Sequence, residues 1–299
     1  MTATASPWAW HAHPDVWAVM GALIVGYVVA RRHWAPAPDE LRVQRRKAVW
    51  FAFGVLALEA ASDWPIHDIS ERYLLSVHMV QHLIVTFVAP PLLLLGLPAA
   101  VLRGLLRPRF VHWAFTRLAR PLPAALLFNT VIAVSHWPAL VDWVVPREPA
   151  HFAVHVVLFT TAVIMWFPVI NRLPEYPSIG DPGRMIYLFL QSVIPTVPAS
   201  FLTFGDSPLY QYYAKVPRPF DITLIADQQM AGGVMKVVGG GLIWTIIAVM
   251  FFRWYARSER ERRGVLTWAD VERELHDVPP PPIPSGTGPP PPPAQPQPK

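Results

Sequence analysis

The stretch HMVQHLIVTFVAPPLLLLGLP, residues 78–98, decides the fold class of this chain. It contains no Asp, Glu, Lys or Arg, and a helix of about 20 such residues crosses a hydrocarbon core about 30 Å thick. Two of its residues, His78 and His82, are nevertheless histidines. Their spacing of four residues places both imidazoles on one helical face, about 6 Å apart along the axis. Polar pairs at this depth are costly and usually functional, so the stretch predicts a membrane helix that carries a metal-binding pair.

The composition of the whole chain also indicates a membrane protein. Of its 299 residues 53% are hydrophobic and 15% are charged, against roughly 25% charged in soluble domains. We therefore expect an all-α, polytopic membrane helix bundle of about seven transmembrane helices. The predicted spans are 16–30, 48–62, 73–97, 121–141, 152–170, 185–204 and 227–252.

Prolines interrupt two of these spans. Pro90 and Pro91 predict a bend in the third span, because proline removes a backbone donor from the helix. Pro195 and Pro198 predict that the sixth span is irregular as well.

The basic residues predict the orientation of the bundle. With the N-terminus outside and the C-terminus cytoplasmic, only four basic residues between the spans lie outside: Arg72, Arg147, Lys215 and Arg218. This bias accounts for the net charge of +5 through membrane topology and contact with membrane lipid, without nucleic acid as a partner.

Four regions follow from the sequence. We expect an extracytoplasmic N-terminal segment (1–15), a seven-helix transmembrane domain (16–255), a short cytoplasmic helix (256–277) and a disordered proline-rich tail (278–299). The N-terminal segment lacks the positive region of a cleavable signal peptide, so we expect the first span to be retained.

The histidines gather on the outer side of this topology. His151 and His155 repeat the spacing of four residues at the start of the fifth span, and His136 lies near the outer end of the fourth. His33, His112 and His276 fall inside, whereas the other eight fall outside: His11, His13, His67, His78, His82, His136, His151 and His155. We predict a metal site formed by His67, His78, His82, His136, His151 and His155.

Other polar residues at the same level are predicted to support this site. Carboxylates commonly orient histidine ligands by accepting from the second ring nitrogen, and Glu59, Asp63 and Asp227 are candidates. Gln228 follows Asp227 at the start of the seventh span, and Met230 and Met235 are candidate thioether ligands. Lys236 lies deep in the same span, where it needs a partner, and Glu59 is the nearest carboxylate by predicted depth.

The residue types favour copper. The chain has no cysteine, which excludes disulfides, CxxC copper sites and iron–sulfur ligation. Imidazole suits zinc, copper and iron, and thioether sulfur favours Cu(I). HMVQH and HFAVH both lack the glutamate of the HExxH motif, which disfavours a zinc peptidase.

We expect no enzymatic activity, because no nucleophile–base pair or carboxylate dyad is evident in the spans. Two alternatives remain open: a haem-binding electron-transfer protein and a copper transporter. A transporter needs a polar path that continues inward, yet the inner halves of spans three to five are nearly all apolar.

Five motifs in order carry a resemblance to a known family. They are SDWPIHD (62–68), residues 78–98, NTVIAVSHWPALVD (129–142), HFAVH (151–155) and DQQMAGG (227–233). Together they resemble the multi-spanning CtaG family of cytochrome c oxidase assembly factors, distinct from the single-span copper protein of proteobacteria with the same name. The resemblance covers roughly residues 15–255, and Lys236 and Val238 depart from the family pattern.

Membership implies a multi-pass protein of the bacterial plasma membrane that helps to build the oxidase by supplying copper to its catalytic subunit. Cytochrome c oxidase subunits are the implied partners. The functional positions that the resemblance implies are Asp63, His67, His78, His82, His136, His151, His155 and Asp227.

Overall fold

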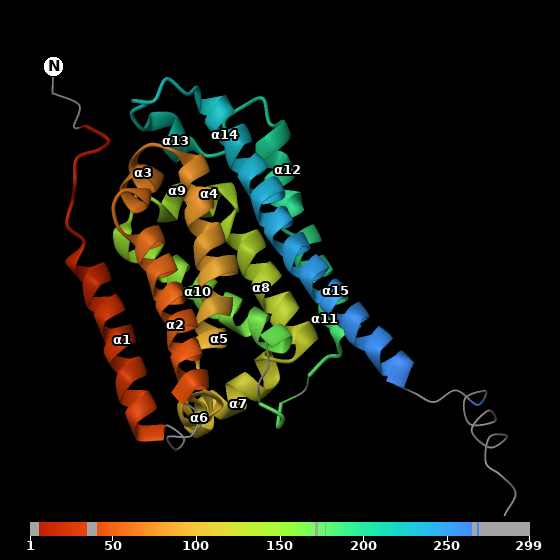
Figure 1. The fold of residues 1–299 in the computed structure, drawn as a ribbon. Helices are drawn as coiled ribbons and strands as arrows, with labels where there is room; N and C mark the ends of the chain where they lie inside the picture. Colours follow the sequence, from red (N-terminus) through yellow and green to blue (C-terminus); the bar gives the residue numbers. More distant parts are fainter. Residues whose placement is uncertain (1–5, 35–40, 171–172, 177, 265–267, 269–299) are drawn as a thin grey trace, which may run out of the picture. The chain divides into compact units, whose positions relative to one another are not determined.

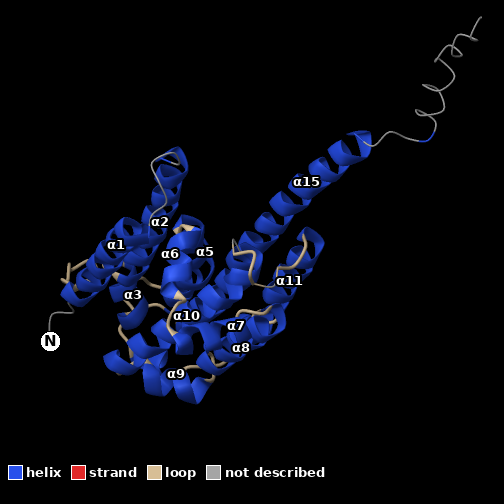
Figure 2. Cartoon of the chain, turned by 90° about the horizontal axis from the view of Figure 1, so that it is seen from below, coloured by secondary structure: helices blue, strands red, loops and turns tan. Residues whose placement is uncertain are grey.

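The computed structural model describes residues 6–34, 41–170, 173–176, 178–264 and 268, and every regular element in these residues is helical (Figures 1 and 2). Six helical stretches are long and apolar enough to cross a membrane: Pro14–Trp34, Arg45–Arg72, Leu75–Gly96, Glu148–Ile170, Asp181–Phe204 and Leu224–Arg262. The prediction of an all-α multi-pass bundle is confirmed.

The fourth predicted span differs from the others. It corresponds to a helix pair, Arg109–Leu118 and Pro121–Ser135, bent by 90°, and counting the pair as one span gives seven. The predicted segment 121–141 is itself broken, because a turn at His136 and Trp137 ends one helix before Pro138 begins the next. Proline at a first helical position favours such a restart.

The helices have the following bounds: α1 Pro14–Trp34, α2 Leu41–Ser62, α3 Ile66–Arg72, α4 Leu75–Leu83, α5 Ala89–Gly96, α6 Ala99–Leu105, α7 Arg109–Leu118, α8 Pro121–Ser135, α9 Pro138–Val144, α10 Glu148–Ile170, α11 Asp181–Val193, α12 Thr196–Phe204, α13 Gln211–Lys215, α14 Leu224–Gly233 and α15 Gly240–Gly264. Two π-helical turns, η2 Ile84–Val88 and η3 Val234–Gly239, join α4 to α5 and α14 to α15.

The chain divides into two compact units, Met1–Phe252 and Arg253–Lys299. In the second unit the described residues are the C-terminal part of α15, through Gly264, and Trp268. The predicted helix 256–277 therefore overlaps α15 at its start, and most of its remainder lies outside the described residues. The predicted tail 278–299 lies wholly outside them.

The stretch α4–η2–α5 is the central element of the first unit. In its most hydrophobic window 61% of residues are buried, compared with 6% in α1. α2 packs along α5 so closely that a Cβ on Gly96 would lie 2.6 Å from Phe51 Cα. α10 packs on the same stretch, and Leu158 and Trp166 join Phe87 in the main apolar core.

The prolines of this stretch disturb its hydrogen bonds rather than ending the span. Pro90 has no N–H to donate to the carbonyl of Thr86, four residues earlier. Trp166 Nε1 of α10 donates to that carbonyl instead, at 2.9 Å. The π-helical turn η2 lies at this point, and Leu75–Gly96 remains one 22-residue span. In the sixth span, helix α11 ends at Val193 and α12 begins at Thr196, so the predicted irregularity is confirmed.

α14 fixes the start of α4, the helix that carries His78 and His82. The Asp227 carboxylate is fully buried and accepts from the backbone N–H groups of Leu75 (2.9 Å) and Ser76 (3.0 Å). These are donors that the first turn of a helix leaves unsatisfied. On the other side of α14, a Cβ on Gly232 would lie 2.6 Å from Ala199 O of α12, so glycine is needed for this approach.

Lys236 does not have the predicted partner. Its ammonium lies over the ring of Phe204, 4.4 Å from the centroid. No ion pair joins it to Glu59 within the part of the chain that the structure describes. The predicted pairing is wrong because Lys236 lines a groove between α11–α12 and α15, together with Ser192, Thr196 and Trp244.

Candidate metal centre

Five histidines from three parts of the fold lie close together. α4 contributes His78 and His82, whose ring centroids are 4.3 Å apart, and α10 contributes His151 and His155, 4.4 Å apart. His136 follows the last residue of α8. Each pair is one helical turn apart, as predicted from the spacing of four residues. We call these five residues the histidine cluster.

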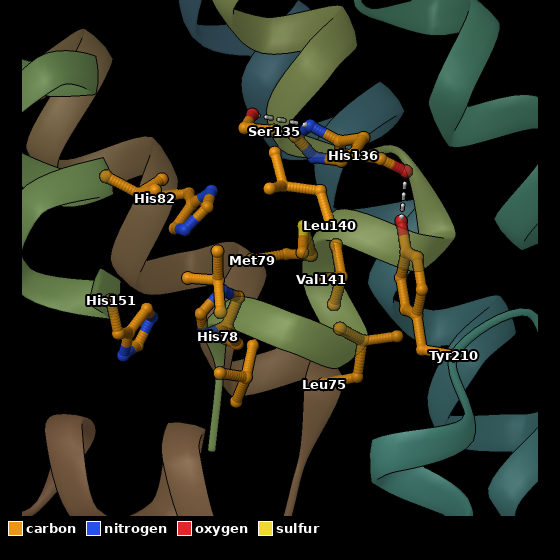
Figure 3. A pocket seen from close by; sticks show the side chains of 13 residues that line it. Leu75, His78, Met79, His82, Ser135, His136, Leu140, Val141, His151 and Tyr210 are labelled. Atoms are coloured by element: carbon orange, nitrogen blue, oxygen red, sulfur yellow. Dashed lines mark hydrogen bonds between the residues drawn. The ribbon is translucent and has the colours of Figure 1, made fainter. Parts of the chain in front are cut away.

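The two helical pairs face each other. The rings of His78 and His151 are stacked with centroids 5.2 Å apart, and those of His82 and His155 lie 5.1 Å apart. His136 completes the group, with its ring edge-on to His82 at 6.0 Å. Figure 3 shows His78, His82 and His151 directed toward the same space, with His136 across from them.

Three members could bind one ion with little movement. One ring nitrogen from each of His78, His82 and His155 lies within 4.8 Å of the others. The Nε2 atoms of His82 and His155 are 3.2 Å apart, close to the spacing of about 3.3 Å between two nitrogens on one tetrahedral ion at 2.0–2.1 Å. The same distance also allows a hydrogen bond between two neutral rings.

Four ring nitrogens of the cluster are buried without a hydrogen-bond partner among the described residues. They are His78 Nδ1, His82 Nδ1, His136 Nε2 and His151 Nε2. A buried polar atom left unsatisfied costs about 1–3 kcal/mol. All four rings line one cavity of about 20 Å³, and about 10–15 Å³ is enough for one water-sized particle. Of the cluster, the nitrogens of His78, His82 and His155 lie close enough together to share one small cation, and the cavity adjoins the rings of His78 and His82.

A hydrogen bond to the backbone leaves the Nε2 atom of His136 unprotonated, as metal binding requires. His136 Nδ1 donates to Ile132 O at 2.8 Å, so Nε2 keeps its lone pair. The hydroxyl of Tyr210 donates to the carbonyl of His136 at 3.1 Å (Figure 3). Burial, assisted by the charge of Asp142, raises the pKa of Tyr210, which keeps this donor protonated.

Glu71 is the residue that sequence reasoning missed. His151 Nδ1 donates to Glu71 Oε1, which leaves His151 Nε2 as the free nitrogen that faces the cavity. The same oxygen lies 3.4 Å from His67 Nε2. Carboxylates often orient ligand imidazoles in this way. The available signal was the spacing of four residues between His67 and Glu71, which puts both on one face of α3.

The carboxylates that were predicted to orient the histidine rings have other surroundings. Asp63 accepts from Trp17 Nε1 at 2.8 Å and from the backbone N–H of Trp64 at 2.7 Å. One oxygen of Glu59 is buried without a partner among the described residues. Neither carboxylate, nor Asp227, bonds to the histidine cluster in the part of the chain that the structure describes.

His67 lies one layer away from the histidine cluster. Its Nδ1 accepts from Gln81 Nε2 at 3.1 Å, and Gln81 Oε1 accepts from Ser70 Oγ at 2.9 Å. Because Nδ1 accepts, the proton lies on Nε2, toward Glu71. The structure therefore groups His67 with Glu71 and not with the three closest nitrogens.

The remaining predicted residues lie outside the cavity. Gln228 accepts from the backbone N–H of Leu209 at 2.7 Å and donates to Ser207 O at 3.1 Å, so it secures the loop before α13. Met230 is 48% exposed. Met79, between the two histidines of α4, is buried and lines the cavity instead.

Comparisons with known proteins identify the family. The family model of the cytochrome c oxidase caa3 assembly factor, Caa3_CtaG, matches residues 2–257. The uncharacterized proteins Mb0105 of Mycobacterium bovis (strain ATCC BAA-935 / AF2122/97) and MT0111 of Mycobacterium tuberculosis (strain CDC 1551 / Oshkosh) are each 26% identical to this chain over 225 residues.

These alignments cover 68% of this chain and 34% of each relative, so the chain spans about a third of the length of the curated relatives. No solved structure matches the chain significantly. The family model includes the whole histidine cluster, Asp227 and Glu71. The chain therefore belongs to the family of cytochrome c oxidase caa3 assembly factors.

Proposed function

We propose that this protein assists cytochrome c oxidase assembly by holding one Cu(I) ion in the histidine cluster and passing it to the catalytic subunit. The observation that carries the proposal is that His78, His82 and His155 each bring one ring nitrogen within 4.8 Å of the others, next to a small cavity lined by imidazoles whose buried nitrogens lack partners among the described residues. An ion bound there relieves the cost of leaving them unsatisfied. In this scheme copper is cargo, and the protein performs no chemical conversion.

The lining of the cavity favours a monovalent soft ion. It contains neutral imidazoles, the buried side chain of Met79 and several aliphatic side chains, and no carboxylate is among the described residues that line it. The cost of burying an ion in a low-dielectric site grows with the square of its charge, so neutral ligands favour Cu(I) over a divalent ion. Thioether sulfur strengthens that preference.

A hydrolytic zinc centre fits less well. Such a centre needs an open ligand position with a general base beside the bound water, commonly a glutamate. Among the described residues, the carboxylate that contacts the cluster is that of Glu71, and it is already bonded to His151 Nδ1, away from the unpartnered Nε2.

A haem needs more space than the cavity among the histidines provides. Sites for molecules of this size usually have volumes of about 300–1,000 Å³. The cavity among the histidines holds about 20 Å³, so a porphyrin would have to separate α4 from α10.

A copper transporter needs polar ligands along the whole path of the ion. Beyond His82 along α4 lies the main apolar core, formed by Leu83, Phe87, Phe128, Leu158 and Trp166 among others. An ion moving through this core would lose its ligands. We therefore propose delivery from one face of the membrane, and the bias of basic residues assigns that face to the outside of the bacterial plasma membrane.

The experiment is a Cu(I) titration of the detergent-purified protein against a competing colorimetric chelator. We expect one Cu(I) per chain in the wild type and loss of binding in His78→Ala/His82→Ala. The matched control is His33→Ala/His112→Ala, which also removes two histidines and should bind as the wild type does. Equal affinity in the wild type and the His78→Ala/His82→Ala variant would remove the proposal.

A second readout addresses delivery. Copper-loaded protein is mixed with purified oxidase catalytic subunit that lacks copper, and the copper content of the subunit is measured after separation. Transfer from wild type should exceed transfer from the His78→Ala/His82→Ala variant, which carries no ion.

A further inference from the structure

Three of the five residues of the histidine cluster are buried, so an ion that reaches them needs a way in. His78, His136 and His151 are 3–7% exposed. A cation that leaves water for such an interior without replacement ligands faces a large desolvation cost. A series of ligand side chains that starts at the surface lowers this cost, because the ion binds the next ligand before it loses the previous one.

The N-terminal segment supplies two further histidines, His11 and His13, which contact Asp68 of α3. His13 Nε2 lies 3.2 Å from Asp68 Oδ2, and His11 Nδ1 lies 3.6 Å from Asp68 Oδ1. The Asp68 side chain is 3% exposed, whereas that of His11 is 41% exposed. Two imidazoles thus approach one buried carboxylate from the aqueous side.

A continuous series of metal-binding side chains connects this pair to the cluster. The ring of His13 is edge-on to that of His67, with centroids 5.1 Å apart. His67 Nε2 lies 3.4 Å from Glu71 Oε1, and Glu71 bonds to His151. The ring of His151, in turn, is stacked on that of His78.

We propose that His11, His13 and Asp68 form an outer copper-capture site that loads the histidine cluster through His67 and Glu71. The inference rests on the proposed function, since it concerns how the same cluster acquires Cu(I). No redox change is involved. At each step one nitrogen or oxygen bond to copper forms while the previous one breaks, and the source chelator is released at the first step.

Arg72 contacts two residues of the capture site and competes with an arriving cation. Its NH1 group donates to His11 Nε2 at 3.3 Å, and its NH2 group lies 3.4 Å from Asp68 Oδ1. An arriving cation must displace this guanidinium from both residues. Arg72 therefore opposes capture, and removing its charge should change the loading rate in the opposite direction to removal of the histidines.

The test is stopped-flow loading of the full-length protein from a coloured Cu(I)–chelator complex, combined with equilibrium titration. We expect His11→Ala/His13→Ala to slow loading on the order of tenfold, because captured ions no longer reach the cluster at raised effective concentration. Its equilibrium affinity should equal that of the wild type, which also reports that the variant is folded. The control is His33→Ala, which removes an exposed histidine near the end of α1. Arg72→Gln should load faster than the wild type.

The outcomes separate this inference from the proposed function. If the wild type binds Cu(I) and His11→Ala/His13→Ala loads at the wild-type rate, the capture site is wrong while the cluster remains. An equal loss of rate and affinity would also overturn it, because the pair would then belong to the equilibrium site. Absence of Cu(I) binding in the wild type would remove both proposals.

Discussion

At one end of the helical bundle five histidines lie close together around a cavity, whereas at the other end the histidines lie at the surface. His33, at the end of α1, and His112, on α7, are both exposed, and His112 Nδ1 lies 3.3 Å from the hydroxyl of Tyr176. The same type of side chain is thus exposed at one end and buried with unpartnered nitrogens at the other.

The carboxylates of the two ends differ in the same sense. At the exposed end Glu175 pairs with Arg103, and both side chains are largely accessible, 42% and 50%. At the histidine end Asp227 and Asp68 are buried, with exposures of 0% and 3%, and each has several partners. Buried charges persist in proteins when they are paired and hydrogen-bonded. At the histidine end, the buried carboxylates of Asp227 and Asp68 thus have partners, whereas four ring nitrogens of the histidine cluster have none among the described residues.

The largest effect in this comparison should come from Asp227. Asp227→Ala removes the charged acceptor of two buried backbone N–H groups at the start of α4. We expect a loss of about 2–4 kcal/mol of unfolding free energy, accompanied by weaker Cu(I) binding because His78 lies on the loosened first turn. Thermal unfolding in detergent measures the first effect and chelator titration the second. Asp206→Ala, at an exposed loop position, is the control and should alter neither.

A smaller effect is expected from Glu71. Glu71→Gln replaces a carboxylate that fixes the proton of His151 on Nδ1 with a neutral amide. Loss of such a supporting partner lowers metal affinity by about 10- to 100-fold. Glu175→Gln makes the same chemical change at the exposed end and should leave Cu(I) affinity unchanged. A Glu71→Gln variant with wild-type affinity would show that His151 needs no orienting carboxylate.

Much of this arrangement was predictable from the sequence, and the reason is periodicity. The spacing of four residues in HMVQH and HFAVH fixes each pair on one helical face, and the apolar context fixes the membrane helices. The prolines likewise predicted the irregularity at Pro195, and Trp137-Pro138, which is typical of a kinked helix end, fits the break between α8 and α9 inside the predicted span 121–141.

The contacts between distant segments were not predictable in the same way. Glu71 reaches His151 across 80 positions of sequence, and Asp227 reaches Ser76 across 151. Glu59 and Asp63 were predicted from their position near the outer end of the second span, and such depth carries no information on which face a short helix such as α3 turns to its neighbours. For the same reason depth paired Lys236 with Glu59, while the rotation of η3 directs it toward Phe204.

The smallest expected effect concerns thermal stability and its dependence on acid, through the ion pair of Glu175 and Arg103 at the exposed end. Arg103 Nε donates to Glu175 Oε1 at 2.7 Å, and this hydrogen bond holds the pKa of the Glu175 carboxyl below its ordinary value. A carboxyl whose pKa is lowered by folding stabilises the folded state at neutral pH and loses that contribution as the pH falls through the lowered pKa. Since both side chains are largely exposed, solvent screens the pair and its contribution is small. We therefore expect Glu175→Gln to lower the midpoint of thermal unfolding slightly at neutral pH and to match the wild type in acid.

Acid should act differently at the histidine end. If the histidine cluster binds copper as proposed, protonation competes for the imidazole nitrogens, and we expect acidification to release Cu(I) from the wild type and from Glu175→Gln alike. Thermal unfolding with and without Cu(I), at neutral and acidic pH, separates the two processes. If Glu175→Gln retained copper in acid while the wild type released it, the two ends would be coupled, and the assignment of copper binding to the histidine cluster alone would be wrong.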